Sequence, residues 1–375
     1  MELNYNTISL LDTVAIIQGL TLGTLLILLN RKKYKPTFFL GIFVFMFSIE
    51  KIPMVLTDLG FWSYYPELYL MPLNHTWLLF PLFYIYIQKV SIFCDEKVNY
   101  LLLIPGMAVF VMQTILFFLP YEQRLLVEEM LWYKLVFSIG NGYALFIAYK
   151  ALVYIDAHMS AVKQHFSSLH YKELKWARTF TFLGILYYMS GLVLLFLPVT
   201  PNEIKVLFTL ANFTIIYWIS FHGTLQFNVE SILSNLDEYG LSLKPEIAKK
   251  ENANLGTMTD SDMEALVMDI DQHMMHSEIF LHTELTLLDL ANALDVHPRK
   301  ISNAINKIRK QNFNTYINRF RIKKAMQLLD SKMAASLSVE GLGHEVGFHS
   351  KSAFYQAFKK ETGITPTRYR ATAMQ

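Results

Sequence analysis

The residues best suited to chemistry are basic and amide side chains that recur at helical spacing near the C-terminal end of the chain. Over residues 298–310 they would occupy one face of a helix and its edges: Arg299, Asn303, Asn306 and Lys310, flanked by Lys300, Lys307 and Arg309. Asn can pair with adenine edges, and Arg or Lys with guanine edges, in the major groove of DNA. This spacing therefore predicts a surface that hydrogen-bonds to nucleic-acid bases.

About fifty residues later the pattern recurs. A helix starting near Ser350 would pack apolar residues inward and present polar ones outward. The inward residues are Phe354, Ala357 and Phe358, and the outward ones are Ser352, Gln356 and Lys359, flanked by Tyr355 and Lys360. The chain therefore carries two such surfaces. Any single side chain among them could instead be ordinary solvated surface.

Each surface needs a short helix before it and a tight turn. Thr286 with Asp289 three residues later predicts a capped helix over Leu287–Leu294, and Asp295-Val296 predicts the turn. Pro298 then suits the first position of the second helix. Its apolar back would be Ile301, Ala304, Ile305 and Ile308.

For the second surface, Ser338 caps an expected helix over Val339–Val346, which Gly347 ends. A longer helix over Phe313–Asp330 would hold the two helix pairs at a fixed separation, suited to successive major grooves. We expect Phe313, Ile317, Phe320, Ala325, Leu328 and Leu329 on its apolar side, and Arg319, Arg321, Lys323 and Lys324 on its outside.

The charge of the chain reverses sign where the first surface begins. Nine Asp/Glu and no Lys/Arg lie between Asp260 and Asp295, whereas fifteen Lys/Arg and four Asp/Glu follow from Val296. The whole chain is close to neutral, at +2. A locally basic module indicates a polyanionic partner, either nucleic acid or an anionic membrane surface. A lipid-binding patch needs no fixed spacing and no paired turns, so the pattern favours DNA.

The framework of this region resembles the AraC/XylS family of transcription regulators over about residues 265–370. The residues that carry the resemblance are Leu290-Ala291 to Ile301-Ser302, Phe320-Arg321-Ile322, Ala325, Leu328-Leu329, Gly347 to Phe354, Phe358-Lys359-Lys360, Gly363, Thr365-Pro366 and Tyr369-Arg370. The resemblance implies a seven-helix DNA-binding domain with two helix-turn-helix motifs, here at 286–308 and 338–361. It departs at His297, where Ser or Thr is usual, and at Gly343, where Ala is usual.

By the family pattern, base-reading positions fall within His297–Lys307 and His349–Lys360. Combined with the faces above, the DNA-binding candidates are Arg299, Lys300, Ser302, Asn303, Asn306, Lys307 and Lys310 in the first helix, and His349, Lys351, Ser352, Tyr355, Gln356, Lys359 and Lys360 in the second.

The first 230 residues have a different character, because seven apolar runs there approach the length of about 20 residues that crosses a bilayer. They are Ile8–Leu29, Thr37–Leu56, Leu68–Ile87, Val98–Leu119, Leu131–Leu152, Trp176–Leu197 and Val206–Phe227. A buried soluble bundle is the alternative, which runs of this length disfavour. In this place most of the family carries a soluble sugar-binding barrel, so the chain resembles the family's membrane-bound members.

Loop charges predict the orientation. Lys and Arg gather in the first, third and fifth loops, including Arg31, Lys32, Lys33, Lys163 and Lys172, whereas the other loops carry few. Since basic loops stay in the cytoplasm, we expect the N-terminus outside and the C-terminus inside. The predicted localisation is the bacterial inner membrane, multi-pass, with the DNA-binding region in the cytoplasm.

Polar residues inside the runs could line a ligand site, and Asn74, His75 and Asn141 are the candidates. A hydrogen bond between helices is the more common role of such residues. The membrane histidines lack neighbouring ligands, so we expect no metal, and we expect no catalytic residues and no cofactor.

The sequence thus predicts an all-α chain: a seven-helix transmembrane bundle (1–230), a juxtamembrane linker (231–257) and a cytoplasmic AraC-type DNA-binding domain (258–375). The predicted function is a membrane-anchored, sequence-specific transcription regulator and one-component sensor. Its expected partners are double-stranded DNA, the lipid bilayer and an unidentified small-molecule or envelope signal, and a homodimer is left open. A transporter or membrane enzyme with a DNA-binding regulatory tail, and a scaffold that tethers DNA without sensing, are the alternatives.

Overall fold

The protein is mostly helical in the part that a computed structural model describes, residues 6–28, 36–93, 98–170, 172–194, 202–225, 258–331 and 338–373. It divides into two compact units. The first comprises Met1–Ala157 and Leu174–Glu230, and the second comprises His158–Glu173 and Ser231–Gln375. The predicted linker, 231–257, lies outside the described residues.

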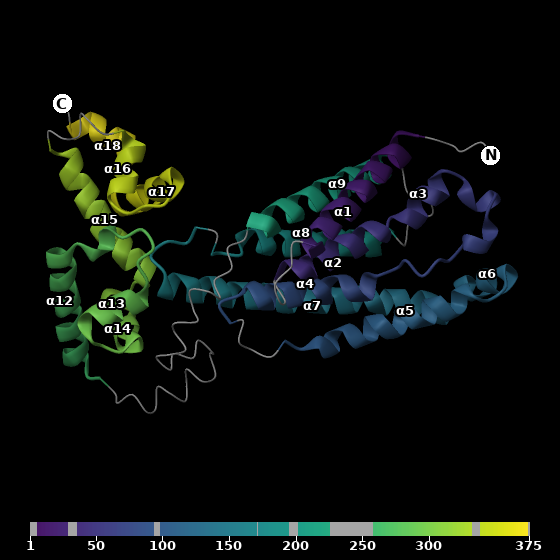
Figure 1. Ribbon diagram of the computed structural model, residues 1–375, viewed down its shortest axis with the longest axis horizontal. Coiled ribbons are helices and arrows are strands. Elements are labelled where there is room, and N and C mark those ends of the chain that lie inside the picture. The colour runs from purple at the N-terminus through teal and green to yellow at the C-terminus, as the bar shows by residue number, and fades with distance from the viewer. Residues whose placement is uncertain are drawn as a thin grey trace. The chain divides into compact units, whose positions relative to one another are not determined.

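The first unit consists of helices that run alongside one another (Figure 1). They are α1 (Thr7–Leu28), α2 (Pro36–Ile49), α3 (Ile52–Asp58), α4 (Thr76–Val90), α5 (Ile104–Phe117), α6 (Tyr121–Glu129), α7 (Leu131–His165), α8 (Lys175–Leu194) and α9 (Asn202–Leu225). The end of α7, from His158, belongs to the second unit. The 3₁₀ turns are Phe61–Ser63, Pro66–Leu68 and Tyr100–Leu103.

Each of the seven predicted runs overlaps a helix, and five helical stretches of the described chain are long and apolar enough to cross a membrane. They are Thr7–Leu28, Pro36–Asp58, Tyr100–Phe117, Leu131–His165 and Val206–Gly223. Helix α4, with 15 residues, and helix α8 are not among these five. The count of seven spans therefore stays a prediction.

Two of the runs are not the single helices that we expected. Thr37–Leu56 is divided between α2 and α3, because Pro53 has no N–H to continue the helical hydrogen bonds across Glu50 and Lys51. In Leu68–Ile87, helix α4 begins only at Thr76. Pro72 and the left-handed backbone of Leu70 (φ 58°) precede it, and neither conformation extends a helix.

The surface of the first unit is strongly apolar. All large apolar side chains that are exposed in the described chain lie in this unit, apart from Met268 and Met275. Phe118 is 80% exposed and Leu131 is 71% exposed, for example. A soluble protein rarely exposes so many large apolar side chains in one unit, whereas lipid tails would cover them. This surface favours a membrane-embedded unit over a soluble bundle.

The second unit contains α12 (Asp260–Ser277), α13 (Leu287–Leu294), α14 (Pro298–Ala304), α15 (Phe313–Leu329), α16 (Val339–Glu345), α17 (Lys351–Thr362) and α18 (Pro366–Ala373) (Figure 1). A 3₁₀ turn at Ile279–Leu281 follows α12. Two apolar clusters form its core. One lies under α12, α13, α14 and the start of α15, and the other lies under the end of α15, α16 and α17. Helix α15 contributes to both clusters and so connects the two halves.

Candidate nucleic-acid interface

The first helix pair, α13 and α14, begins with the predicted capping box. Thr286 Oγ1 accepts from the Asp289 N–H at 3.1 Å, and the Thr286 N–H donates to Asp289 Oδ2 at 2.8 Å. Asp295 ends α13 in the left-handed conformation, with φ of 53°. Pro298 is the first residue of α14, as expected. The apolar back is also confirmed, since Ile301, Ala304 and Ile305 are fully buried and Ile308 packs against the same cluster.

Beyond Ala304 the second helix continues with a different turn from the α-helical one that we expected. Residues Ile305–Arg309 form a π-helical turn, which Lys310 ends in the left-handed conformation (φ 53°). A π turn contains an extra residue, so the side chains after Ala304 are displaced around the axis from the positions that a 3.6-residue period assigns. His297 does act as the N-cap, because its Nδ1 accepts from the Arg299 N–H at 3.3 Å.

The candidates on this pair differ in exposure. Asn303, Lys307 and Lys310 are exposed, whereas Arg299, Lys300, Ser302 and Asn306 are half-buried. The amide of Asn306 donates to Ser302 Oγ at 3.4 Å. Asn303 is therefore the candidate whose amide is most open to a partner.

Helix α12 neutralises part of the basic surface next to this pair. Lys307 Nζ is bonded to Asp260, and Arg309 is bonded to Asp271, which also accepts from the Tyr316 hydroxyl. The acidic and basic stretches of the sequence are thus paired in space. Lys307, a predicted DNA contact, already has a carboxylate partner.

The second helix pair, α16 and α17, has the predicted caps. Ser338 Oγ accepts from the Gly341 N–H at 2.9 Å, and Ser350 Oγ accepts from the Ala353 N–H at 3.3 Å. Gly347 lies between the helices with φ of 90°, and a Cβ there would lie 2.6 Å from the Leu281 carbonyl oxygen. The turn therefore requires glycine for its conformation and for its close approach.

Gly343, a departure from the family pattern, lets a core ring approach α16. An added Cβ would lie 3.1–3.2 Å from atoms of Phe354. Phe354 and Phe358 are fully buried and pack edge to face, with ring centroids 5.6 Å apart. The bulk that Ala would add at position 343 is supplied here by the Phe354 ring.

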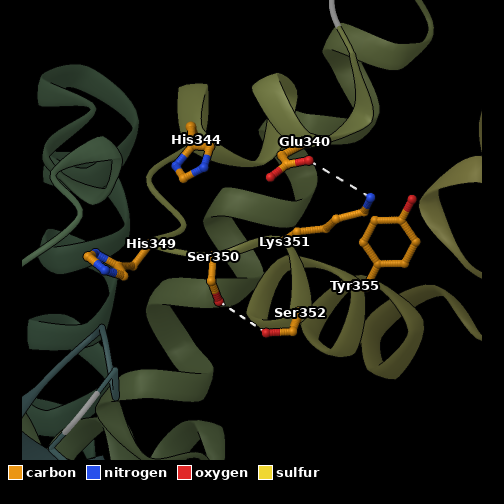
Figure 2. A pocket seen from close by; sticks show the side chains of 7 residues that line it. All are labelled: Glu340, His344, His349, Ser350, Lys351, Ser352 and Tyr355. Atoms are coloured by element: carbon orange, nitrogen blue, oxygen red, sulfur yellow. Dashed lines mark hydrogen bonds and ion pairs between the residues drawn. The ribbon is translucent and has the colours of Figure 1, made fainter. Parts of the chain in front are cut away.

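Seven residues around the start of α17 line an open depression of about 670 Å³ (Figure 2). They are Glu340, His344, His349, Ser350, Lys351, Ser352 and Tyr355. Lys351 extends toward Glu340, at 3.8 Å, and its ammonium lies over the Tyr355 ring. Four predicted contacts, His349, Lys351, Ser352 and Tyr355, are thus brought together. Gln356, Lys359 and Lys360 are exposed further along the helix.

Arg321 is a residue whose role the sequence pattern missed. We expected it on the outside of α15, but its side chain is 1% exposed. Its guanidinium donates to the carbonyl oxygens of Phe280 and His282, each at 2.7 Å. Burial lowers the pKa of Arg321 to about 10, so it stays protonated at neutral pH. Phe320 and Leu328 are only half-buried, whereas Tyr316 and Ile322 take the core positions.

The ligand-site candidates of the first unit contact neighbouring helices. The Asn74 carbonyl accepts from Gln113 Nε2 at 2.9 Å, and its N–H donates to Gln113 Oε1 at 3.3 Å. His75 is buried and its ring stacks on Phe110, whereas Asn141 is half-buried on α7. The bonds to Gln113 are made by the Asn74 backbone, while its side-chain oxygen accepts from the Thr76 N–H at 3.2 Å, so a ligand site here stays a prediction. Among the described residues no cluster of metal-ligating side chains occurs.

Residues 290–372 match the helix-turn-helix domain family. The C-terminal region is an AraC-type helix-turn-helix domain. Regulatory protein PocR of Salmonella typhimurium (strain LT2) is 29% identical over 114 residues, 30% of this chain and 34% of PocR. YtdP of Bacillus subtilis (strain 168), an uncharacterized HTH-type transcriptional regulator, is 29% identical over 98 residues, 26% of this chain and 12% of YtdP. The chain therefore spans about a third or less of the curated relatives it matches.

Solved structures also resemble the AraC-type domain. The C-terminal domain of AraT, a response regulator from Geobacillus stearothermophilus, is 29% identical, with 28% of this chain and 84% of that chain covered and a TM-score of 0.25. The C-terminal domain of the response regulator yesN from Fusobacterium nucleatum is 27% identical, with 28% and 98% covered and a TM-score of 0.25. The family match and the curated regulators, and not these structures, indicate DNA-binding transcription regulation, which agrees with the expectation that the chain is not an enzyme.

Proposed function

We propose that the protein is a membrane-anchored transcription regulator in which both helix pairs of the AraC-type domain are helix-turn-helix motifs that read DNA. In this proposal α14 and α17 are the recognition helices and occupy successive major grooves. The observation that carries it is the repeated arrangement of a capped helix, a left-handed residue and a second helix with an apolar back and polar front. Helix α15 supports a fixed separation between the two motifs, because both apolar clusters include it.

The first unit would be the membrane anchor and sensor. Its exposed apolar surface and its five apolar helical stretches support insertion in a bilayer. The basic loops support an outside N-terminus and a cytoplasmic AraC-type domain, where DNA is accessible. A signal in the bilayer or the envelope would then change the affinity of the domain for promoters, a coupling between two sites.

A transporter or membrane enzyme with a DNA-binding tail is the second candidate. Buried polar contacts between helices of the first unit are the observation that favours it. Lys51 Nζ donates to the Tyr187 hydroxyl at 3.0 Å, and Thr209 Oγ1 donates to Asp12 Oδ2 at 3.0 Å. Uptake of a substrate that depends on residues 1–230 alone would establish this alternative.

The test of DNA reading uses the full chain in lipid nanodiscs and a duplex that it enriches from a random pool. The expected footprint spans about two helical turns and weakens steeply with salt. Asn303→Ala should relax the preference at one base pair by about 1–3 kcal/mol, and Gln356→Ala should do so in the other half-site. Binding to anionic liposomes without any sequence preference would support a lipid-binding role instead.

The matched control is Lys323→Ala. Lys323 is exposed on α15 and lies outside the proposed reading set, so base preference should not change. Lys324 is a poorer control, because its Nζ is bonded to Glu278 at 2.6 Å. If Asn303→Ala leaves the footprint and the preference as they are in the parent chain, the proposed reading face of α14 is wrong.

A further inference from the structure

The segment that joins α7 to α8 belongs to the same compact unit as the AraC-type domain. Within it Phe166 and Ser167 are 2% exposed and Ser168 is 7% exposed. Buried backbone groups need hydrogen-bond partners. The backbone N–H and C=O groups of this buried segment must therefore find hydrogen-bond partners within the same unit.

The backbone of Ser167 is bonded to the domain on both sides. Its N–H donates to the Leu285 carbonyl at 3.0 Å, as part of an antiparallel bridge between Phe166 and Thr286. Its carbonyl accepts from Asn314 Nδ2 at 2.6 Å. The segment thus pairs with the chain just before α13 and with the first turn of α15.

The side chain of Ser167 reaches the buried arginine. Ser167 Oγ accepts from Arg321 at 3.1 Å, while the same guanidinium holds the 280–283 backbone. Arg321 also lies over the Phe348 ring, 5.6 Å from its centroid. Phe280 belongs to one apolar cluster and Phe348 to the other. The segment therefore docks where the two halves of the AraC-type domain meet.

An ion pair joins the C-terminal end of the segment to the AraC-type domain. Lys172, only 3% exposed, donates to Glu284 Oε2 at 2.6 Å, and its ammonium lies over the Phe166 ring. The Lys172 carbonyl is 2.8 Å from His158 Nε2, which ties the segment back to the end of α7. A lysine this deeply buried is stable only with such a partner, so the pair is specific to the docked position.

The docked segment also covers a residue of the proposed DNA interface. The His170 and His349 rings lie with centroids 4.1 Å apart, and Glu284 Oε1 lies 3.9 Å from His349 Nδ1. The His349 side chain is still 45% exposed, so the His170 ring covers part of it and leaves the rest open to a partner.

We propose that residues 166–170 and 172 act as an intrachain ligand of the AraC-type domain, which binds at the junction of its halves and competes with DNA for part of the His349 side chain. The competition rests on the proposed DNA-binding function, whereas the docking does not. Because the segment is continuous with α7 and α8, the membrane unit holds the domain by this contact in addition to the 226–257 connection. A signal that pulls the segment away would expose the part of His349 that His170 contacts.

The experiment is hydrogen–deuterium exchange on the full chain in nanodiscs, with and without the enriched duplex. Lys172→Glu should accelerate exchange in peptides that contain Ser167 and Leu285 by about tenfold or more, because like charges would face each other. Lys172→Glu with Glu284→Lys should restore protection. Asn314→Ala, which removes one hydrogen bond to the segment, should give a smaller acceleration at the same peptides.

The same variants test the competition. Lys172→Glu should bind the duplex about threefold or more tightly, and the duplex should accelerate exchange of the segment in the parent chain by a similar factor, since linkage is reciprocal. Arg178→Glu is the control with the same charge change. Arg178 pairs with Asp156 at 2.8 Å within the first unit, so it should change neither exchange nor affinity.

Unchanged exchange in both Lys172→Glu and Asn314→Ala would overturn the docking. A duplex that slows exchange of the segment, or leaves it as it was, would overturn the competition. If no chain binds DNA with sequence preference, the proposed function fails, and the exchange of the variants still decides whether the segment docks.

Discussion

At the scale of single residues, Arg321 connects several buried parts of the AraC-type domain. Its guanidinium donates to the Phe280 and His282 carbonyl oxygens, and the His282 oxygen also accepts from the Leu285 N–H at 3.2 Å. Arg321→Met should lower the free energy of unfolding by about 1–3 kcal/mol, because the Phe280 carbonyl loses its donor and the His282 carbonyl loses one of its two. Arg321→Lys should recover only part of this, since one ammonium does not reproduce the planar fork. Amide exchange within α15 at increasing denaturant measures the loss.

The control for this prediction is Arg319→Met on the same helix. Arg319 is 42% exposed and pairs with Glu361 at 3.3 Å, so its loss should cost less than about 1 kcal/mol. An equal loss of unfolding free energy in the two variants would show that the burial of Arg321 does not increase its contribution to stability.

His170 makes the docking of residues 166–170 and 172 sensitive to pH. Burial, followed by the neighbouring His349 and Lys172, lowers the pKa of His170 in the docked state, although Glu284 opposes them. The undocked ring keeps a pKa near the usual 6.5, so the undocked state takes up the proton first. Docking should be at full strength above pH 6.5 and weaken as pH falls below it.

Exchange of the Ser167 peptide, corrected for the intrinsic pH dependence of amide exchange, measures this effect. In the parent chain, protection of the Ser167 peptide from exchange should fall between about pH 7.5 and about pH 5.5, on either side of the usual histidine pKa of about 6.5. His170→Gln should flatten the profile. A parent profile as flat as that of the variant would mean that His170 does not titrate with docking.

At the scale of elements, the turn between α16 and α17 has the strictest steric requirement. Gly347→Ala should destabilise the second half of the AraC-type domain by more than about 1 kcal/mol, because left-handed strain is joined by a clash with the Leu281 carbonyl. Gly363→Ala is the matched variant, since φ there is 81° and no atom lies within 4 Å of the added Cβ. Exchange in α17 should therefore rise more for Gly347→Ala, and equal effects would contradict the clash.

Elements with local signals could be predicted from the sequence. Thr286 with Asp289, Pro298, Ser338 and Gly347 act within a few residues of their own position, so their chemistry is visible in the sequence. The π turn at Ile305–Arg309 could not be predicted in this way. Apolar residues at a helical period are equally compatible with an α turn, and packing against α12 distinguishes the two only in three dimensions.

The candidate site shows the same limit. Asn303, Gln356 and Lys359 are exposed as their faces predicted, because amphipathic periodicity reports burial. The partners of Lys307, Arg321 and His349 are carboxylates, carbonyls and a ring that lie tens to hundreds of residues away in sequence. Neither periodicity nor composition contains information on such distant pairs.

At the scale of the whole molecule, the loop charges predict opposite sides for two exposed serines. In a Cys94→Ser background, Ser63→Cys should react with a membrane-impermeant maleimide in intact cells, because the second loop is predicted outside. Ser331→Cys, in the AraC-type domain, should react only after lysis. Labelling of Ser331→Cys in intact cells would reverse the proposed orientation.

The carboxylates of α12 give the whole protein a built-in threshold for polyanions. Asp260 and Asp271 form ion pairs with Lys307 and Arg309. They act as counterions to these two side chains, but unlike salt ions they belong to the chain and stay at low salt concentration. A DNA phosphate must displace these two carboxylates before it can bind Lys307 or Arg309. Strands that are weakly charged or poorly aligned therefore gain little binding free energy from these two side chains. In the membrane-anchored regulator proposed above, these ion pairs should disfavour nonspecific contacts with DNA and so favour sites that align with the domain.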